Sequence, residues 1–383
     1  MQYKDFQDLK LSALGLGCMR LPKYGEADED IDLAAAQDMV DYALAHGVNY
    51  FDTAWGYHNH ASEIAVGKCL AKHPRDSYYL ATKFPGYDLS NMDKVEEIFE
   101  EQLKKTGAEY FDFYLFHNVC ELNIDAYLEH TEIYDYLMEQ KKNGRIKHLG
   151  FSAHGEIPVM KRFLDAYGKD MEFCQIQLNW FDWAFQDAKG KVALLDEWNI
   201  PVWVMEPLRG GKLVAVDSGT GLTQERMDKI ETIRPGMDIV EAGLRFLQSV
   251  PGVVVTLSGM SNMEQLQQNI ALYDEDKALD ADEQAKLLAV ADEIINEHNV
   301  PCTACRYCTT ECPQGIDIPT MISAYNQLRA GASGDFIARM IVSNTPEGQR
   351  PGDCIGCGAC AAVCPQAINI PEILADFAER LAG

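Results

Sequence analysis

The sequence lacks the features that mark membrane-spanning, secreted and nucleic-acid-binding proteins. No run among its 383 residues approaches the ~20 consecutive apolar residues that a membrane-spanning helix needs. The first residues, Met1 to Lys10, contain charged side chains but no apolar run, so we expect no secretory signal. Lys and Arg number 33 against 59 Asp and Glu, and this acidity repels phosphate backbones and anionic lipid head groups. We therefore expect a cytoplasmic protein with no nucleic-acid and no membrane partner.

The 12 cysteines are unevenly distributed along the chain. Four are scattered before residue 300, and eight lie between Cys302 and Cys364. In a chain without a secretory signal, clustered cysteines indicate metal ligation rather than disulfides. We expect the scattered four to act as small apolar residues.

Short runs rich in β-branched and aromatic residues alternate with segments of helical spacing before residue 280. The runs expected as strands are Leu14–Cys18, Val48–Thr53, Tyr78–Lys83, Phe111–Phe116, Lys147–Ser152, Phe173–Leu178, Pro201–Met205 and Gly252–Leu257. The segments expected as helices are Ile31–His46, Ala61–His73, Asp93–Thr106, Ile124–Lys142, Val159–Tyr167, Lys191–Asn199, Ile239–Val250 and Met263–Leu272. Eight strand–helix units predict an α/β fold of the (β/α)8 TIM-barrel type. The rival is a doubly wound open sheet, and the missing Gly-x-Gly-x-x-Gly run after the first strand weakens it.

The longest interruption of this alternation is Lys212–Asp238, after the seventh predicted strand. A long loop at that end of a barrel strand often covers an active site. A surface excursion without function explains the segment equally well.

Ionisable residues end three neighbouring predicted strands. Asp52 ends the second, with Tyr57 soon after it, Lys83 ends the third and His117 follows the fourth. Catalytic groups of a (β/α)8 barrel lie at the C-terminal ends of its strands. Singly, the aspartate could cap a helix, the lysine could be solvated and the histidine could be structural. Together they predict a proton-transfer set.

The chemistry of such a set follows from its charges. A tyrosine pKa of ~10 is too high for a good acid at neutral pH, and we expect the Lys83 ammonium to lower the pKa of Tyr57. Asp52 would hold the ammonium, and His117 would donate a hydrogen bond to a substrate carbonyl. Tyr57 could then protonate a carbonyl oxygen while a hydride reaches its carbon.

These segments resemble a known family. Phe-Asp-Thr-Ala-Trp-Gly-Tyr (51–57), Thr82-Lys83 and Leu-Phe-His-Asn (115–118) look like the Asp, Tyr, Lys, His tetrad of the aldo-keto reductase family. The resemblance extends over roughly residues 1–275. It implies a barrel that binds NADPH or NADH without a Rossmann fingerprint and acts on a small-molecule carbonyl substrate. It also implies that Tyr57 is the acid/base, that Lys83 and Asp52 tune it, and that His117 orients the substrate.

The same resemblance implies which residues meet the nicotinamide dinucleotide. Ser152 and Gln175 would face the carboxamide, and Leu208 and Gly210 would approach the pyrophosphate. Met205 stands where the family has an aromatic residue that stacks on nicotinamide. The full implied cofactor set is Gly17, Met19, Arg20, Ser152, Gln175, Met205, Leu208, Gly210, Gly259, Gln265 and Asn269.

The chain also departs from the family pattern. Ala153 follows Ser152 where the family usually has Asn, and the run 258–265 contains no Lys or Arg that could pair with a 2′-phosphate. Both NADH and NADPH therefore stay open as cofactors.

Four tryptophans lie near the ends of predicted strands, at Trp55, Trp180, Trp183 and Trp203. They could line an apolar substrate pocket. Packing in the core or at its rim is the equally weighted alternative.

The eight clustered cysteines form two identical runs. Each has the spacing Cys-x2-Cys-x2-Cys-x3-Cys-Pro, and the ligands expected from it are Cys302, Cys305, Cys308 and Cys312, then Cys354, Cys357, Cys360 and Cys364. This spacing is typical of bacterial ferredoxins with two 4Fe–4S clusters. Zinc is the competing metal, and the doubled run with its following proline disfavours it.

The resemblance to two-cluster ferredoxins implies a crossed arrangement, in which the fourth cysteine of each run ligates the other cluster. We expect two domains: residues 1–280 as the barrel, and residues 281–383 as a connector helix with a small, mainly helical ferredoxin-like domain. Ala281–His298 is the expected connector, and Ile318–Leu328 and Phe336–Ser343 are further expected helices.

The sequence therefore predicts an oxidoreductase that reduces a carbonyl or oxidises an alcohol. Nicotinamides carry two electrons and iron–sulfur clusters one, so the clusters could be structural, could exchange electrons directly with a substrate, or could work through a flavin. No flavin signature supports the last alternative. A redox protein partner is also possible. The alternative to an oxidoreductase is an electron-transfer or binding protein whose barrel is not an active reductase.

Overall fold

The computed structural model describes residues 1–216, 221–330 and 333–382. The chain divides into two compact units. The first comprises Met1–Pro207 and Glu241–Asp280, and the second comprises Leu208–Val240 and Ala281–Gly383. The segment Leu208–Val240, which follows the seventh barrel strand, thus packs with the C-terminal part of the chain.

The first unit is built around a closed parallel barrel, as the alternation of strand and helix predicts. Its strands neighbour one another in the order β10, β3, β4, β5, β6, β7, β8, β9. Their bounds are β3 Leu14–Gly17, β4 Tyr50–Asp52, β5 Tyr79–Phe84, β6 Phe111–Val119, β7 Ile146–Ala153, β8 Cys174–Gln177, β9 Val202–Met205 and β10 Val253–Ser258. Each overlaps one of the eight predicted runs, and the barrel fold is confirmed.

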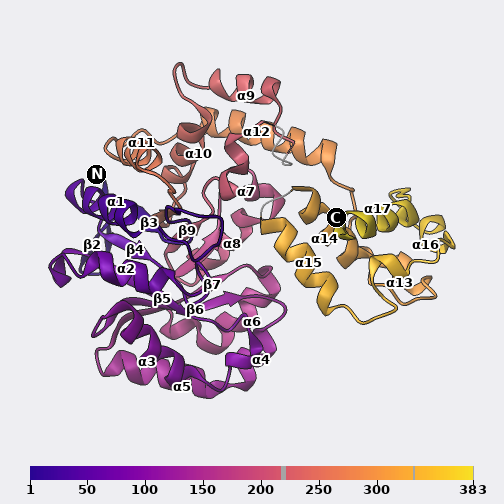
Figure 1. Ribbon diagram of the computed structural model, residues 1–383. Helices are drawn as coiled ribbons and strands as arrows, with labels where there is room; N and C mark the ends of the chain where they lie inside the picture. Colours follow the sequence, from indigo (N-terminus) through magenta and orange to yellow (C-terminus); the bar gives the residue numbers. More distant parts are fainter. Residues whose placement is uncertain (217–220, 331–332, 383) are drawn as a thin grey trace. The chain divides into compact units, whose positions relative to one another are not determined.

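Helices surround this barrel (Figure 1). They are α1 Leu33–Ala45, α2 Ser62–Leu70, α3 Val95–Thr106, α4 Ile124–Glu129, α5 Thr131–Lys142, α6 Ile157–Tyr167, α7 Asp182–Phe185, α8 Ala188–Glu197, α10 Ile239–Gln248 and α11 Met263–Tyr273. Local chemistry sets several ends: the Asp32 carboxylate accepts from the first amides of α1, and Gly107, with φ of 66°, ends α3. The predicted helix Ile124–Lys142 is two helices, because His130 has φ of −89° and ψ of 64°.

The strand register brings the predicted site residues to one edge of the barrel. Asp52 pairs with Ala81, and Lys83 pairs with Leu115, two residues before His117. Asp52 ends β4, Lys83 is the penultimate residue of β5 and His117 lies near the end of β6, so they gather at the C-terminal edge, where barrel enzymes hold their chemistry.

A hairpin closes the opposite end of the barrel, and the sequence did not predict it. It consists of β1 Tyr3–Phe6 and β2 Leu9–Ser12, paired antiparallel. The Phe6 ring lies 5.1 Å from the ring of Trp203 and 5.7 Å from that of Phe113, measured between centroids. Trp203 is therefore a core residue of the barrel. It packs in the core and does not line a substrate pocket.

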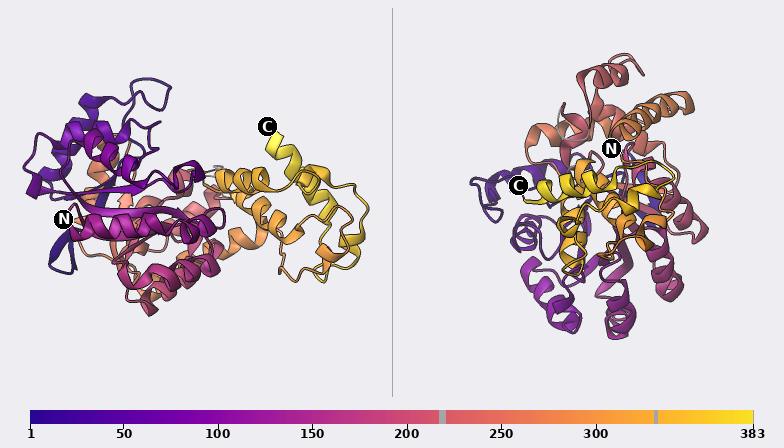
Figure 2. Two further views of the ribbon diagram at one scale, coloured as in Figure 1. Left: turned by 90° about the horizontal axis from the view of Figure 1, so that it is seen from below. Right: turned by 90° about the vertical axis from the view of Figure 1, so that its right-hand side faces the viewer.

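The described residues of the second unit form helices and connecting loops (Figure 2). The elements are η4 Arg209–Val214, α9 Gln224–Glu231, α12 Ala281–His298, α13 Tyr307–Thr310, α14 Ile318–Ala330, α15 Ser333–Asn344, η5 Pro351–Asp353, α16 Ala359–Ala362 and α17 Ile370–Ala382. Ion pairs join α9 to α12, including Lys229 with Glu293 at 2.8 Å. The described residues of the long interruption are thus partly helical. Among the described residues, no helix combines the length and apolarity that crossing a bilayer requires.

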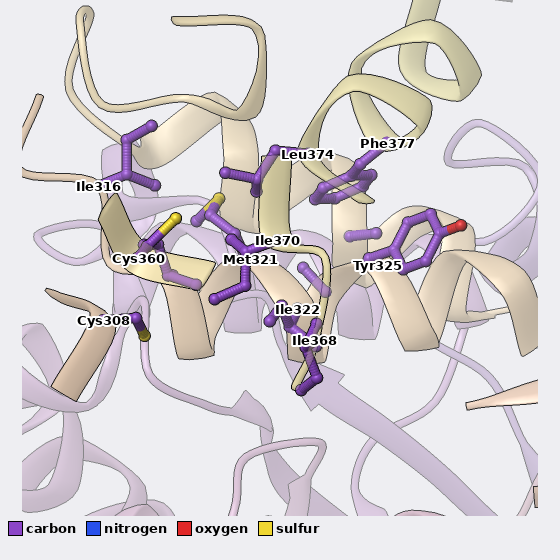
Figure 3. Packing of buried hydrophobic residues seen from close by; sticks show 13 residues of the cluster. Cys308, Ile316, Met321, Ile322, Tyr325, Cys360, Ile368, Ile370, Leu374 and Phe377 are labelled. Atoms are coloured by element: carbon purple, nitrogen blue, oxygen red, sulfur yellow. The ribbon is translucent and has the colours of Figure 1, made fainter. Parts of the chain in front are cut away.

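The second unit contains an internal repeat that surrounds its core. The helices α13 and α14 recur as α16 and α17, displaced by 52 residues, and each longer helix follows a Cys-Pro-Gln run. Tyr325 of α14 and Phe377 of α17 occupy equivalent positions, and their ring centroids lie 5.6 Å apart. Figure 3 shows the shared apolar cluster, to which one cysteine of each run, Cys308 and Cys360, also belongs.

Candidate active site and cluster cavities

A buried ion pair lies at the centre of the candidate active site. Lys83 Nζ donates to Asp52 Oδ1 at 2.7 Å and to the backbone oxygen of Thr53 at 2.9 Å. Burial alone would lower the pKa of Lys83, but the Asp52 carboxylate and the Tyr57 hydroxyl reverse the shift and raise it. Lys83 is thus held as an ammonium although it is fully buried.

Tyr57 stands next to this ammonium. Its Oη lies 3.4 Å from Lys83 Nζ, and its ring lies under the same ammonium, 4.9 Å from Nζ to the centroid. Burial raises the pKa of Tyr57 above its ordinary value, and the Lys83 ammonium offsets only part of that rise. The Lys83 ammonium thus lowers this pKa as expected, but the net shift of the Tyr57 pKa is upward because desolvation outweighs the neighbouring charge.

His117 completes the predicted set as a neutral imidazole. Its ring centroid lies 6.1 Å from that of Tyr57 and 5.1 Å from that of Tyr87. Burial, then the charges of Lys83 and His154, lower its pKa well below the ordinary value. A neutral histidine can still donate one hydrogen bond to a carbonyl oxygen.

A buried polar network supports the strand that carries Lys83. The Gln102 amide donates to the Lys83 backbone oxygen at 3.0 Å and to Glu63 Oε1 at 2.8 Å. The Thr82 hydroxyl also donates to Glu63 Oε1, at 2.7 Å. Glu63 is fully buried, and Lys105 reaches its other oxygen at 3.4 Å.

Lys105 also fixes one tryptophan near the site. Its Nζ lies 3.6 Å from the centroid of the Trp55 ring, a geometry in which the cation attracts the face of the indole. Trp55 is half-buried, as a side chain at the rim of a substrate site would be. By contrast, Trp180 is fully buried and Trp183 packs against Phe246 of α10, with ring centroids 5.6 Å apart.

Several of the predicted dinucleotide residues gather where β3 and β10 end. A Cβ built on Gly17 would lie 3.3 Å from the Ser258 backbone oxygen, and one built on Gly259 would lie 3.3 Å from the Arg20 side chain. Asn269 donates to the Ser258 hydroxyl at 3.0 Å. A cation, Arg20, therefore lies against the segment that itself contains no Lys or Arg.

Other members of that predicted set lie on β7, β8 and β9, after β3 and in α11. Gln265 Oε1 accepts from the Ser261 amide at 2.8 Å, and Met19 is exposed. Ser152 and Gln175 are register partners on β7 and β8. Met205 ends β9 and is half-buried.

Leu208 and Gly210 of the predicted set belong to the second unit. They lie at the start of η4, where Gly210 has φ of 64° and Gly211 has φ of 88°. This left-handed turn favours glycine at both positions.

The eight clustered cysteines line two cavities in the second unit. The first cavity is lined by Cys302, Cys305, Cys308 and Cys364, and the second by Cys312, Cys354, Cys357 and Cys360. Each cavity thus takes three cysteines from one run and the fourth from the other, which is the crossed grouping. Four cysteine thiolates are the usual ligands of a 4Fe–4S cluster. Among the described residues, no group of three or more His, Cys, Asp or Glu side chains has the geometry to hold a single metal ion.

The backbone around the two cavities follows the same path in both halves. Left-handed conformations occur at Ala304 and Gly356, at Arg306 and Gly358, and at Gly315 and Ala367, all with φ between 52° and 76°. Alternation of left- and right-handed residues builds concave surfaces of amides that hold anions such as thiolate-bound clusters. Non-glycine residues accept this conformation at a cost, so the loop shape is required at both cavities.

Two family models match the chain. A model of the Aldo/keto reductase family matches residues 13–292, and a model of the 4Fe-4S dicluster domain matches residues 301–368. The chain therefore belongs to the aldo/keto reductase family, and it carries a 4Fe-4S dicluster domain at its C-terminal end.

Individual relatives agree with this assignment. A probable aldo-keto reductase of Glycine max is 27% identical over 54% of this chain and 58% of its own length. An uncharacterized oxidoreductase of Bacillus subtilis is 27% identical over 69% of this chain and 87% of its own. The chain thus spans little more than half the length of the first of these relatives.

Solved structures show the same fold. An aldo-keto reductase of Bacillus halodurans in its holo form has a TM-score of 0.62 and 23% identity, over 76% of this chain and 96% of its own. An aldo-keto reductase of Klebsiella pneumoniae in complex with NADPH has a TM-score of 0.58 and 20% identity, over 76% of this chain and 96% of its own. At this identity the likeness concerns the fold alone.

Sequence reasoning missed four residues near the site: Glu63, Tyr87, Lys105 and His154. Their importance depends on partners distant in sequence, such as Gln102 for Glu63. Of the four, His154 could most readily have been predicted from the sequence, because it directly follows Ala153 at the end of β7. A second ionisable residue at a strand end is the same signal that pointed to Lys83.

Proposed function

We propose that the barrel catalyses the NAD(P)-dependent reduction of a small-molecule carbonyl compound, or the reverse oxidation of an alcohol. The observation that carries this proposal is the Tyr57 hydroxyl 3.4 Å from an ammonium that is itself fixed by Asp52 at 2.7 Å. Such an arrangement supplies a proton at one defined atom beside the end of the barrel.

Each residue has a separate task in this reaction. The bound nicotinamide supplies or accepts the hydride. Tyr57 Oη donates its proton to the carbonyl oxygen in reduction, and the Lys83 ammonium stabilises the negative charge left on the tyrosine oxygen. His117, neutral at physiological pH, donates a hydrogen bond that orients the carbonyl. Asp52 holds Lys83 in place.

The dinucleotide would lie across the ends of β3 and β10. Gly17 lets the end of β3 lie close to the Ser258 backbone, Gly259 lets the Arg20 side chain lie against the segment after β10, and Arg20 supplies a positive charge there for the phosphates. Ser152, Gln175 and Met205 would meet the nicotinamide end, and Asn269 the adenine end. NADH and NADPH both remain candidates. One relative, the NADH-specific methylglyoxal reductase of Escherichia coli, is 26% identical over 54% of this chain and 66% of its own length, and its name supports NADH as one of them.

The C-terminal domain would hold two 4Fe–4S clusters in the crossed arrangement. The chemistry of the donor set supports this, because each cavity is lined by four cysteines and otherwise mainly by isoleucine, leucine and proline. A cluster supplies one-electron transfer when bound. The proposal includes a redox protein as a second partner and a cytoplasmic location, which suits oxygen-sensitive thiolate sites.

Anaerobic purification followed by iron, sulfide and cofactor analysis tests this proposal. We expect iron and sulfide for two four-iron clusters, binding of NADH or NADPH, and turnover of some members of a panel of aldehydes and ketones. A flavin in the extract would identify a mediator between hydride and single-electron transfer. Failure to bind any nicotinamide would instead favour an electron-transfer protein with an inactive barrel.

A further inference from the structure

The internal repeat makes the two cluster cavities comparable position by position. Beside its cysteines, the first cavity is lined by Pro319, Ile322, Ile368 and Ile370, and the second by the equivalent Pro371, Leu374, Ile316 and Ile318. These walls are apolar in both. Because these wall residues are equivalent, the two cavities can be compared directly at the positions where their residues differ in charge or polarity.

Two wall positions differ in chemistry. Arg306 lines the first cavity where Gly358 lines the second, and Thr303 stands where the second has Ile355. The exposed Arg306 guanidinium pairs with Asp317 at 3.2 Å. Asp317 lines neither cavity, and it lies between Ile316 and Ile318, which line the second.

The direct sequence neighbours of the ligands differ in the same sense. Glu311 precedes Cys312 and Asp353 precedes Cys354, both of which line the second cavity. The equivalent neighbours at the first cavity are Val363, before Cys364, and Pro301, before Cys302. The ligand neighbours thus include one cation and no anion at the first cavity, and two anions and no cation at the second.

Charge near an iron–sulfur cluster is one of the main determinants of its reduction potential. A nearby cation favours the reduced form, which carries one more negative charge, and nearby carboxylates disfavour it. We propose that the two sites are unequal, and that Arg306 at the first and Glu311 and Asp353 at the second make the first the site of higher reduction potential. This inference rests on the proposed loading of both cavities.

A direction of electron flow follows from this order. One electron that leaves the second site reduces the first by one electron, and no proton or further reactant is needed. With both clusters bound, a single electron would reside mainly at the first site. Arg306 thus acts as a tuning residue of the first site and is not one of its ligands.

A redox titration of the anaerobic full-length protein, followed by EPR, tests the proposed order of the two reduction potentials. The variants exchange the residues at the equivalent positions 306 and 358. Arg306→Gly should lower the higher of the two midpoint potentials, and Gly358→Arg should raise the lower one. For one exposed unit charge we expect the ratio of reduced to oxidised cluster to change by about threefold to tenfold, where tenfold corresponds to 59 mV for one electron. Both substituted residues have left-handed backbone in the protein, at φ of 64° and 76°, and each replacement already occurs at the equivalent position.

Further variants separate this effect from damage to the domain. Asp317→Asn should raise the higher potential, because it removes the anion beside Arg306. Arg380→Gln, which removes an exposed cation of α17 remote in sequence from every cysteine, should leave both potentials unchanged. The inference is overturned if Arg306→Gly lowers the lower potential, or moves neither while the iron content is intact. Wild-type protein with too little iron for two clusters would defeat the two-cluster proposal itself, and this inference with it.

Discussion

Lys83 Nζ lies 2.7 Å from Asp52 Oδ1, and the two side chains are only 1% and 4% exposed. An ion pair this deeply buried costs desolvation free energy that its attraction repays only when both partners are present. Stability and chemistry thus depend on the same two side chains, and the two contributions can be separated by mutation.

Removing one partner should destabilise the barrel more than removing both. We expect Asp52→Ala to cost about 3–5 kcal/mol in the free energy of unfolding, because it leaves the Lys83 charge buried and unpaired. The double variant Asp52→Leu, Lys83→Met should regain much of that stability without regaining turnover. Denaturant unfolding followed by tryptophan fluorescence measures this, since all five tryptophans, from Trp55 to Trp203, lie in the barrel unit. Equal losses in the single and double variants would contradict the account.

Glu172 should make the barrel sensitive to acid. Burial alone would raise its pKa, but hydrogen bonds from His148, Lys141 and Gln7 lower it to about 2. Because the folded pKa lies below the unfolded one, this carboxylate stabilises the barrel above pH ~4.5, and the contribution disappears as the pH falls toward 2.

The variant Glu172→Gln should therefore lose on the order of 2 kcal/mol at pH 7 and much less at pH 2. Tryptophan fluorescence during denaturant unfolding at both pH values provides the measurement. Glu139→Gln, which changes an exposed glutamate of α5, is the matched control and should change neither value. A loss that is the same at both pH values would argue against the carboxylate charge.

The hairpin residue Phe6 should contribute to stability without affecting the chemistry. Its ring packs against those of Trp203, Phe113 and Phe173, at the end of the barrel opposite Tyr57. We expect Phe6→Ala to cost about 3–5 kcal/mol and to leave kcat/KM of the folded enzyme unchanged. Tyr3→Ala, on the same hairpin but 47% exposed, should cost much less. A strong loss of turnover in folded Phe6→Ala protein would show that the hairpin does more than close the barrel.

The crossed cysteine grouping predicts which single replacements are equivalent. Cys312→Ser and Cys357→Ser should damage the same cluster and leave the same EPR signal, whereas Cys305→Ser should leave the other. A sequential arrangement predicts instead that Cys312→Ser and Cys305→Ser behave alike. EPR spectra of the three reduced variants, normalised to iron content, distinguish the two arrangements.

Features that depend on local pattern could be predicted from the sequence. The strand runs, such as Phe111–Phe116, are apolar enough to be recognised individually. The Cys-x2-Cys-x2-Cys spacing by itself predicts ligation of an iron–sulfur cluster. The hairpin strand Tyr3–Phe6 escaped because Lys4 and Asp5 make it polar and only Phe6 is buried.

Features that depend on contacts between distant segments could not be predicted. Nothing in Glu63 itself reveals that Thr82 and Gln102 bond to it, and the packing of Leu208–Val240 with the C-terminal unit is a tertiary property. The net direction of the Tyr57 pKa shift could not be predicted for a related reason. The charge of Lys83 is visible in the sequence, but the burial that outweighs it is not.

The most direct test of the central claim is kcat/KM for carbonyl reduction by Tyr57→Phe and by wild-type protein, measured as oxidation of NADH or NADPH across a range of pH. Phe keeps the ring and removes only the proton donor, so we expect a loss of about 10²–10⁴-fold with nicotinamide binding unchanged. Because burial raises the pKa of Tyr57, the tyrosine keeps its proton at neutral pH, and the wild-type rate should fall only on the alkaline side as that proton is lost. Turnover by Tyr57→Phe at the wild-type rate would contradict the account.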